Sequence, residues 1–364
     1  YTLLAPTGIA SKVLSETTGR KAHTIHRMLG QGGMIETDVV IIDEISMIGV
    51  EHMGMICPAL YDNTKVVMIG DNAQLASIAC GNIIHDITKW GKVPTANLTK
   101  VFRYGKGGID TVATDTRTEK PFLSDSGTTL FKGDNQYMFI QADDNPLQQV
   151  VNEYGELIEL GYDKDDILIL TPYNVGDYGT YAINQEIQTH YNNSNSVPFI
   201  PSNNVKDNQF KISFLVGDRV LNTKNHYEME IYHDFDNDES VGVNYTDIFN
   251  GDIGIVRKTD KNYMVVEFDD TLVKIDKPQG REFLLGNAVS IHKIQGGAAK
   301  AIILLTTNHH KRMLTNNLLY VALTRAKEKI IHIGDVSAIN NSLYIHETES
   351  RNTWLYDMLG GGND

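Results

Sequence analysis

The chain has 364 residues, of which 41% are hydrophobic and 21% charged, and its formal net charge is −14. This length allows two or three domains with cores of their own, and no apolar run approaches the roughly 20 residues that a membrane span needs. The negative charge argues against strong non-specific binding to duplex DNA, but it leaves room for a groove that grips a single strand. The two cysteines, Cys57 and Cys80, are too few for a disulfide framework and predict a reducing cytoplasm.

Short runs of Val, Ile and Leu recur along the chain, and each ends in a polar or glycine-containing turn. This pattern is typical of parallel strands buried on both faces. The runs cover residues 2–5, 39–42, 66–69, 167–170, 301–305 and 330–333. Helices are expected at residues 9–16, 147–160 and 314–328, the first two closed by Gly19 and Gly161. Such alternation predicts an open α/β sheet with ligands at the carboxyl ends of its strands.

Residues 210–275 show a different pattern, because polar and apolar residues alternate there. Turn pairs such as Asn250-Gly251 and Asp269-Asp270 recur, and together they predict a small antiparallel β-barrel or hairpin insertion. Residues 234–238 imitate the start of a calcium loop. Glu239 and Tyr245 stand where that loop requires glycine and glutamate, so we interpret the segment as a solvated acidic hairpin tip.

Two adjacent carboxylates, Asp43 and Glu44, follow the apolar run at residues 39–42. In a P-loop nucleotidase the first carboxylate holds Mg²⁺, directly or through water, and the second orients the attacking water. The pair therefore predicts a nucleotide site. Taken alone, the motif fits a strand followed by a polar turn about equally well.

The next apolar run ends in Gly70-Asp71-Asn72-Ala73-Gln74. If the two strands pair in parallel, Gln74 lies beside the carboxylates, where an amide can bond a terminal phosphate; the alternative is an Asp-Asn turn. Arg103 and Arg325 are candidates for neutralising charge on a transferred phosphoryl group. For a lone arginine, an ordinary exposed position is the commoner explanation.

Two further segments combine groups that can contact phosphates. Residues 290–297 place a hydroxyl, an imidazole, an ammonium, an amide and two glycines together, although a turn between strands would also explain them. Pro6 and Thr7 precede a helix whose first amides can bind phosphate, while Thr7 can equally act as the helix cap. His23 and His26 have no third ligand at metal spacing, so no zinc site is predicted.

The order and spacing of these motifs resemble the motif series of superfamily 1 helicases, and especially of the RecD/Dda-like group that moves 5′ to 3′. The resemblance implies an α/β fold with two RecA-like parallel-sheet domains and an SH3-like β-barrel insertion. Residues 1–100 would form the first motor domain, residues 101–209 and 276–364 the second, and residues 210–275 the insertion. It further implies ATP and Mg²⁺ as cofactors, and single-stranded DNA and junctions of single-stranded with duplex DNA as partners.

The resemblance also carries roles to individual residues. The catalytic roles fall on Asp43, Glu44, Gln74, Arg103 and Arg325, with Asp43 as the metal ligand and Asp43 and Gly296 at the nucleotide. Contacts to single-stranded DNA fall on Pro6, Thr7, Thr24, His26, Ser290, His292, Lys293 and Gln295.

The sequence departs from the family pattern in several places. The family's Walker A loop would precede Tyr1, and no Gly-Lys-Ser/Thr occurs in the sequence, so this chain is expected to bind ATP poorly. Residues 30–37 are shorter than the family's strand-separating hairpin. Residues 297–300 replace a Ser-Glu-aromatic continuation, and residues 75–78 lack the usual proline. A divergent or trimmed protein would explain these departures, as would a sequence that omits mobile loops.

The sequence as a whole predicts a cytoplasmic, ATP-dependent single-stranded DNA translocase that unwinds duplex DNA. Two alternatives stay open. The absent Walker A loop suggests a motor-like scaffold that binds single strands without hydrolysis. An RNA-directed ATPase of the same fold is the other, because contacts to the 2′-hydroxyl cannot be read from these motifs.

Overall fold

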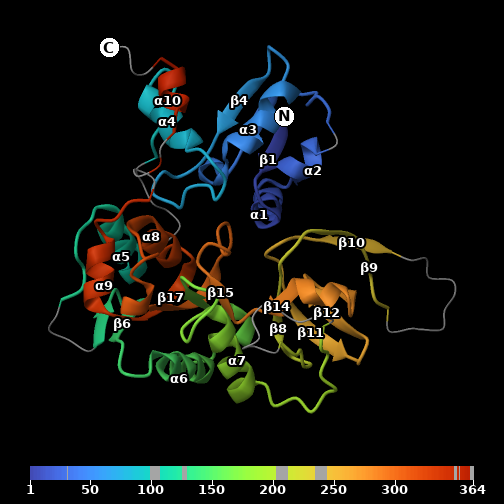
Figure 1. Cartoon of the computed structure of the whole chain (residues 1–364), viewed down its shortest axis with the longest axis vertical. Helices are drawn as coiled ribbons and strands as arrows, with labels where there is room; N and C mark the ends of the chain where they lie inside the picture. Colours follow the sequence, from blue (N-terminus) through green and yellow to red (C-terminus); the bar gives the residue numbers. More distant parts are fainter. Residues whose placement is uncertain are drawn as a thin grey trace. The chain divides into compact units, whose positions relative to one another are not determined.

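The computed structural model describes residues 1–30, 32–98, 107–124, 129–201, 212–233, 244–347, 351 and 353–360 (Figure 1). Its helices are α1 (Gly8–Thr18), α2 (Ile25–Leu29), α3 (Val50–Ile56), α4 (Ile83–Trp90), α5 (Gly108–Arg117), α6 (Pro146–Glu159), α7 (Thr180–Tyr191), α8 (Asn316–Leu323), α9 (Val336–Ser342) and α10 (Leu355–Met358). Its strands are β1 (Thr2–Ala5), β2 (Ala22–Thr24), β3 (Val39–Ile42), β4 (Lys65–Met68), β5 (Thr129–Lys132), β6 (Tyr137–Gln141), β7 (Ile167–Thr171), β8 (Arg219–Asn222), β9 (His226–Glu230), β10 (Tyr245–Ile248), β11 (Ile253–Thr259), β12 (Tyr263–Phe268), β13 (Thr271–Asp276), β14 (Phe283–Leu285), β15 (Ala288–Ser290), β16 (Ala299–Thr306) and β17 (Ala326–Gly334).

The chain divides into two compact units. The first comprises residues 1–141, 295–300 and 306–364, and the second comprises residues 142–294 and 301–305. The domain boundaries drawn from the family resemblance, at residues 100, 209 and 275, stay predictions. None of the helices in the described part of the chain is both long and apolar enough to cross a membrane.

A four-stranded parallel sheet with the order β2-β1-β3-β4 lies in the first unit. β1 and β3 alternate with helices as the sequence predicted. Helix α1 begins after Thr7, whose side chain accepts the Ala10 amide, and it ends at Gly19 in the left-handed conformation that glycine adopts without strain. The sheet therefore has the carboxyl ends of β1, β3 and β4 side by side.

The prediction that residues 66–69 are buried on both faces is wrong. Val66 and Val67 in β4 are 37% and 45% exposed, and Ile69 just beyond the strand is also exposed. β4 pairs with β3 on one side, and its other edge has no strand partner among the described residues. An apolar run shows that a strand can be buried, but neighbouring elements decide whether it is.

A six-stranded sheet has the order β15-β7-β16-β17-β6-β5. The pairs β15–β7, β7–β16 and β6–β17 are parallel, and β5 pairs antiparallel with β6. Every residue of β7 is buried, as expected for a strand covered on both faces. The helix predicted over residues 314–328 is wrong in its second half. Helix α8 ends at Leu323, and β17 begins at Ala326 because its apolar end joins this sheet.

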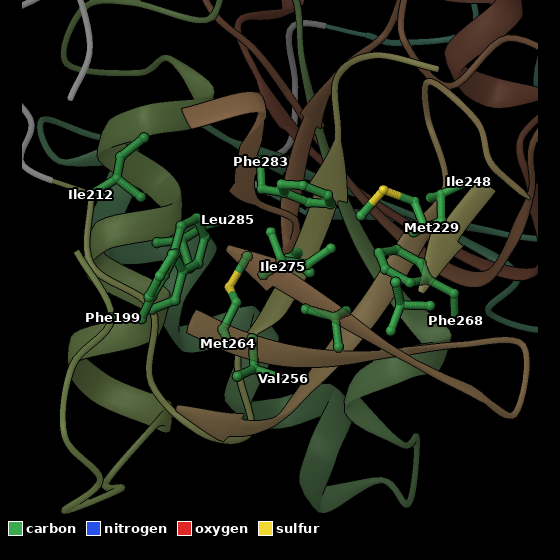
Figure 2. Packing of buried hydrophobic residues seen from close by; sticks show 14 residues of the cluster. Phe199, Ile212, Met229, Ile248, Val256, Met264, Phe268, Ile275, Phe283 and Leu285 are labelled. Atoms are coloured by element: carbon green, nitrogen blue, oxygen red, sulfur yellow. The ribbon is translucent and has the colours of Figure 1, made fainter. Parts of the chain in front are cut away.

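Residues 212–285 contain antiparallel strands, as their alternation predicted. A five-stranded sheet has the order β13-β12-β11-β8-β14, and β9 pairs with β10 in a separate ribbon. Asp269 and Asp270 both have positive φ, which the tight turn between β12 and β13 requires. Figure 2 shows Met264, Ile275 and Phe283 converging in the core of this region. That the region is an SH3-like barrel stays a prediction. Phe210, its predicted first residue, and the acidic segment at residues 234–238 lie outside the described residues.

The end of the described chain returns to α4. Helix α10 lies beside α4 (Figure 1), where the Lys89 ammonium sits 4.4 Å from the centroid of the Tyr356 ring. The Arg351 guanidinium donates to the carbonyls of Ala79 and Gly81, at 3.2 and 3.1 Å. These contacts fasten the C-terminal segment to the stretch that follows the Gln74 turn.

Candidate nucleotide and nucleic-acid site

The carboxylate pair lies at the carboxyl end of β3, inside the four-stranded sheet. The Asp43 amide donates to the Leu4 carbonyl at 2.9 Å, and the Ile45 amide donates to the Ile69 carbonyl at 2.9 Å. The Glu44 amide donates to Asp43 Oδ1 at 2.9 Å, which orients that carboxylate. Both side chains are half-buried. The carboxylates therefore lie between the ends of β1 and β4, where parallel sheets bind ligands.

Glu44 adopts a left-handed backbone conformation, with φ 51° and ψ 44°. A residue other than glycine is strained there, at a typical cost of about 1–3 kcal/mol. Gly70 lies in the turn after β4, and a Cβ atom on it would come within 2.5 Å of Ile45 Cγ2 in the turn after β3. Glycine at position 70 thus permits the close approach of the turn after β4 to the turn after β3.

Gln74 lies in the turn that follows β4, as its spacing predicted. The backbone amide of Gln74 donates to the Asp71 carbonyl at 3.1 Å, and the backbone amide of Ala73 donates to Asp71 Oδ1 at 3.0 Å. The side-chain oxygen of Gln74 is buried and has no hydrogen-bond partner among the described residues. Such an atom is costly to leave unsatisfied, so it marks a place where a ligand donor would be favourable.

Helix α8 contacts this turn through two side chains. The Asn317 side-chain amide donates to the carbonyls of Ala73 and Gln74, at 3.0 and 3.2 Å. The Tyr320 hydroxyl donates to Asp71 Oδ2 at 3.0 Å. The carboxylate of Asp71 also lies 3.9 Å from an Arg117 nitrogen. The turn is therefore held by its own bonds on one side and by α8 on the other.

Arg325 follows α8 and is buried, with 2% of its surface exposed. Its Nε donates to the Val321 carbonyl at 3.1 Å and a terminal nitrogen donates to the Gly297 carbonyl at 3.2 Å. Its other terminal nitrogen donates to Thr324 Oγ1 at 3.2 Å. The alternative of an exposed surface arginine is therefore wrong. Arg103, the other predicted arginine, lies outside the described residues.

Three residues of this arrangement received no role from the sequence: Asp71, Asn317 and Tyr320. Asp71 stands in the predicted turn motif, where only Gln74 carries a predicted role. The signal for Asn317 was present, because two adjacent asparagines open a helix whose other residues are almost all apolar. Buried amides in such a helix are expected to have partners, but the sequence does not show which ones.

The predicted DNA-contacting residues near the N-terminus serve largely as helix caps. Thr7 caps α1, and the Thr24 hydroxyl accepts the Arg27 amide at 3.2 Å at the start of α2. Thr24 is buried, whereas Pro6 and Thr7 are half-buried and His26 is exposed. The His26 ring lies edge-on to His52, with 5.0 Å between their centroids. Of these side chains, His26 is the most open to a bound strand.

The predicted segment at residues 290–297 falls in both units. Ser290, His292 and Lys293 belong to the second unit, where Ser290 is buried at the end of β15 and burial lowers the pKa of Lys293. Gln295 and Gly296 belong to the first unit. The Gln295 side-chain nitrogen is buried without a partner among the described residues. A Cβ on Gly296 would lie 3.5 Å from Ala10 Cβ and 3.6 Å from the Ala10 amide nitrogen. Gly296 therefore borders the first turn of α1.

The donor set suits a nucleotide-bound magnesium ion rather than a closed protein cage. Across the described ranges no three His, Cys, Asp or Glu side chains gather closely enough to hold a metal ion. Mg²⁺ that accompanies a nucleotide is commonly held by one or two carboxylates together with phosphate oxygens and water. Asp43 and Glu44 meet that requirement, and the side-chain oxygen of Gln74, which has no partner among the described residues, belongs to the turn after the neighbouring strand β4.

Two family models match the chain. Residues 2–126 match an AAA domain and residues 285–332 match a UvrD-like helicase C-terminal domain. Solved structures are similar as well. The Pif1 helicase from Bacteroides in complex with ADP-AlF3 and single-stranded DNA is 18% identical with a TM-score of 0.52, covering 99% of this chain and 86% of that one. The Pif1 helicase from Candida albicans is 16% identical with a TM-score of 0.53, covering 99% and 89%. This shared fold confirms the predicted α/β class with a RecA-like parallel-sheet core.

Curated relatives point to a narrower group. The ATP-dependent RecD2 DNA helicase of Deinococcus radiodurans is 28% identical over 372 residues, which covers 98% of this chain and 46% of that protein. The RecBCD enzyme subunit RecD of Mycolicibacterium smegmatis is 25% identical over 373 residues, covering 91% and 61%. The chain thus spans about half the length of these relatives. The resemblance drawn from the motifs is confirmed as a similarity in sequence to a RecD2 DNA helicase and to RecD subunits.

Proposed function

We propose that this chain forms the motor core of an ATP-dependent DNA helicase that moves 5′ to 3′ along single-stranded DNA and opens duplex DNA at junctions. One observation carries the proposal. The Asp43–Glu44 pair and the Gln74 turn follow the carboxyl ends of two neighbouring parallel strands, β3 and β4. The turn is hydrogen-bonded to helix α8, which precedes Arg325. A carboxylate pair, an amide and a buried arginine are the groups that phosphoryl transfer uses. The kinship with RecD-like helicases supports the same conclusion.

In this proposal each side chain has a separate task. Asp43 would hold Mg²⁺, and bound Mg-ATP would supply the phosphoryl group with part of its charge neutralised. The Glu44 carboxylate accepts a proton from the attacking water, and the Gln74 amide orients groups at the terminal phosphate. Arg325 stabilises negative charge once its guanidinium exchanges backbone carbonyls for phosphate oxygens. Arg103 would share that last task.

The proposed grip on DNA relies on few cations. Thr7, His26 and Lys293 are candidates for contacts to the strand, together with the remaining predicted residues Pro6, Thr24, Ser290, His292 and Gln295. The lowered pKa of Lys293 would return toward its usual value beside a phosphate, because an opposite charge favours the ammonium form. Binding should weaken as salt rises, since phosphate contacts release counterions.

The first test is Mg²⁺-dependent ATP hydrolysis by this chain, with and without oligothymidine. We expect the strand to stimulate hydrolysis. A matched oligouridine tests the RNA-directed alternative, and forked duplexes with a 5′ or a 3′ tail test direction. Salt-sensitive strand binding without any hydrolysis would instead identify the scaffold that the sequence left open. Loss of both properties would contradict the proposed function.

The Glu44→Gln variant tests the proposed proton acceptor. It keeps the shape of the side chain and removes the carboxylate, so DNA-stimulated hydrolysis should fall by about 10²–10⁴-fold, the range for loss of a general base. Affinity for oligothymidine, measured by fluorescence anisotropy, should change less than about twofold. Glu51→Gln, at an exposed position in the first turn of α3, serves as the matched control. Turnover retained by Glu44→Gln would exclude this role.

A further inference from the structure

We propose that Asn317 and Tyr320 are positioning residues that couple the Gln74 turn to α8 and Arg325. The inference rests on the proposed function and assigns to it two residues that the motif series left without a role. Four features support it. They are the fixed orientation of Asn317, the hydrogen bond from Tyr320 to Asp71, the rigidity of α8, and the Gln74 side-chain oxygen, which has no partner among the described residues.

The side-chain amide of Asn317 is held in one orientation by three polar atoms. Its nitrogen donates to the carbonyls of Ala73 and Gln74, and its oxygen accepts the Glu347 amide at 3.1 Å. Asn317 is 2% exposed, so water does not compete for these bonds. The Asn317 side chain thereby fixes two consecutive carbonyls of the turn, those of Ala73 and Gln74.

Tyr320 lies three residues further along α8, which puts both side chains on the same face of the helix. Its hydroxyl bonds Asp71 Oδ2, while Asp71 Oδ1 accepts the Ala73 amide. Asp71 therefore connects the helix with the interior of the turn. A hydrogen bond to a carboxylate is stronger than one between neutral groups, so this contact is the firmer of the two.

Helix α8 transmits position because it cannot deform easily. Seven of its eight residues are buried, and Tyr320 is the half-buried exception. Arg325 follows it by two residues and is bonded back to the Val321 carbonyl of the same helix. A shift of the Gln74 turn therefore moves the helix that supports Arg325, and a shift of Arg325 acts on the turn.

The side-chain oxygen of Gln74 has no partner among the described residues, whereas the backbone amides and carbonyls of Ala73 and Gln74 are all hydrogen-bonded. This division suits a sensing group, since the backbone is anchored to α8 and the amide is left for a ligand. Asn317 and Tyr320 therefore determine how strongly ligand binding at the Gln74 side chain shifts Arg325. They need not touch the nucleotide themselves.

The experiment compares Asn317→Ala and Tyr320→Phe with wild-type protein in two independent measurements. The first is hydrogen–deuterium exchange of the Ala73 and Gln74 amides, which needs neither nucleotide nor turnover. We expect each variant to speed this exchange about tenfold, as loss of one such bond allows. Tyr344→Phe removes an exposed hydroxyl nearby in the sequence and should leave the exchange unchanged.

The second measurement is ATP hydrolysis with and without oligothymidine. DNA-stimulated kcat should fall about tenfold in both variants, while KM for ATP and affinity for oligothymidine should change less than about twofold. A merely structural role would shift affinity and thermal stability together with kcat. The pair Tyr320→Phe and Asp71→Ala should be non-additive, because each removes one partner of the same bond.

Two results would overturn the inference: unchanged exchange of the turn in both variants, or faster exchange with an unchanged ratio of DNA-stimulated to basal hydrolysis. Failure of the proposed function looks different. Wild-type protein would then show no stimulation by DNA, and the coupling role would fall with it. Exchange would still report whether α8 holds the turn.

Discussion

Two parallel-paired strands of this protein, β7 in the six-stranded sheet and β4 in the four-stranded sheet, have similar compositions but different surroundings. β7 in the six-stranded sheet is buried at every position, whereas three of the four residues of β4 in the four-stranded sheet are exposed. Both segments are rich in Val, Ile or Leu. The difference teaches that an apolar run specifies a strand, while its degree of burial is set by elements distant in the sequence.

The largest effect expected from this comparison is the loss of a buried side chain from the six-stranded sheet. Ile303 in β16 is fully buried, so Ile303→Ala should lower the free energy of unfolding by about 2–5 kcal/mol. Val67→Ala in β4 is its counterpart and should cost less than about 1 kcal/mol, since Val67 is already 45% exposed. Urea denaturation of both variants measures the difference. Equal losses would show that β4 is covered in solution.

The second effect concerns a buried histidine in the six-stranded sheet. His332 in β17 bonds the hydroxyls of Tyr137, at 2.9 Å, and Thr306, at 2.6 Å, and burial lowers its pKa to about 3. In the unfolded chain its pKa is about 6.5, so below that pH the unfolded state binds the proton and the folded state does not. His332 therefore contributes stability that is present above pH 6.5 and lost as pH falls toward 3. The four-stranded sheet offers no fully buried histidine for comparison.

The expected loss is about 1.4 kcal/mol for each pH unit below 6.5. Urea midpoints measured from pH 7 to pH 5 check it, with His332→Gln as the comparison. The variant should be less stable at pH 7, because glutamine does not reproduce both bonds, and its pH dependence should be shallower. Parallel slopes for the two proteins would show that His332 is not the group responsible.

The smallest effect concerns the open edge of β4. Within the described ranges this edge has no strand partner, and Val66 and Val67 are exposed, so the edge can pair with the same edge of another molecule. Val67→Lys should reduce concentration-dependent self-association, measured by sedimentation velocity, and change the free energy of unfolding by no more than about 0.5 kcal/mol. Val13→Lys, on an exposed position of α1, adds the same charge away from the edge. Equal reductions in both variants would attribute the effect to net charge alone.

Much of the fold could be predicted because its signals are local. The predicted strands match β1, β3, β4, β7, β16 and part of β17, and Gly19 and Gly161 have the positive φ that helix ends favour. The helix predicted over residues 314–328 fails after Leu323, because β17 begins at Ala326 with Lys327 and Glu328 exposed. Those charges lie at the solvent end of β17, and the apolar residues after them enter the sheet.

The candidate site was less predictable than the fold. The spacing of Asp43, Glu44 and Gln74 indicated neighbouring strand ends, and the structure brings the two turns together. The bonds from Asn317 and Tyr320 join residues more than 240 positions apart, and no local pattern contains that information. The sequence also could not predict the conformation of the Arg325 guanidinium, because two of its partners are backbone carbonyls, which every residue has.

The backbone conformation of Glu44 lowers the stability of the fold, while its side chain supplies a carboxylate at this position. Its left-handed conformation would be relaxed by glycine, which adopts φ 51° without a steric penalty. A lineage selected for thermal endurance alone would thus drift toward glycine at this position and lose the carboxylate. The proton-accepting role proposed for Glu44 would explain a glutamate at this position despite its small and continuing thermodynamic disadvantage.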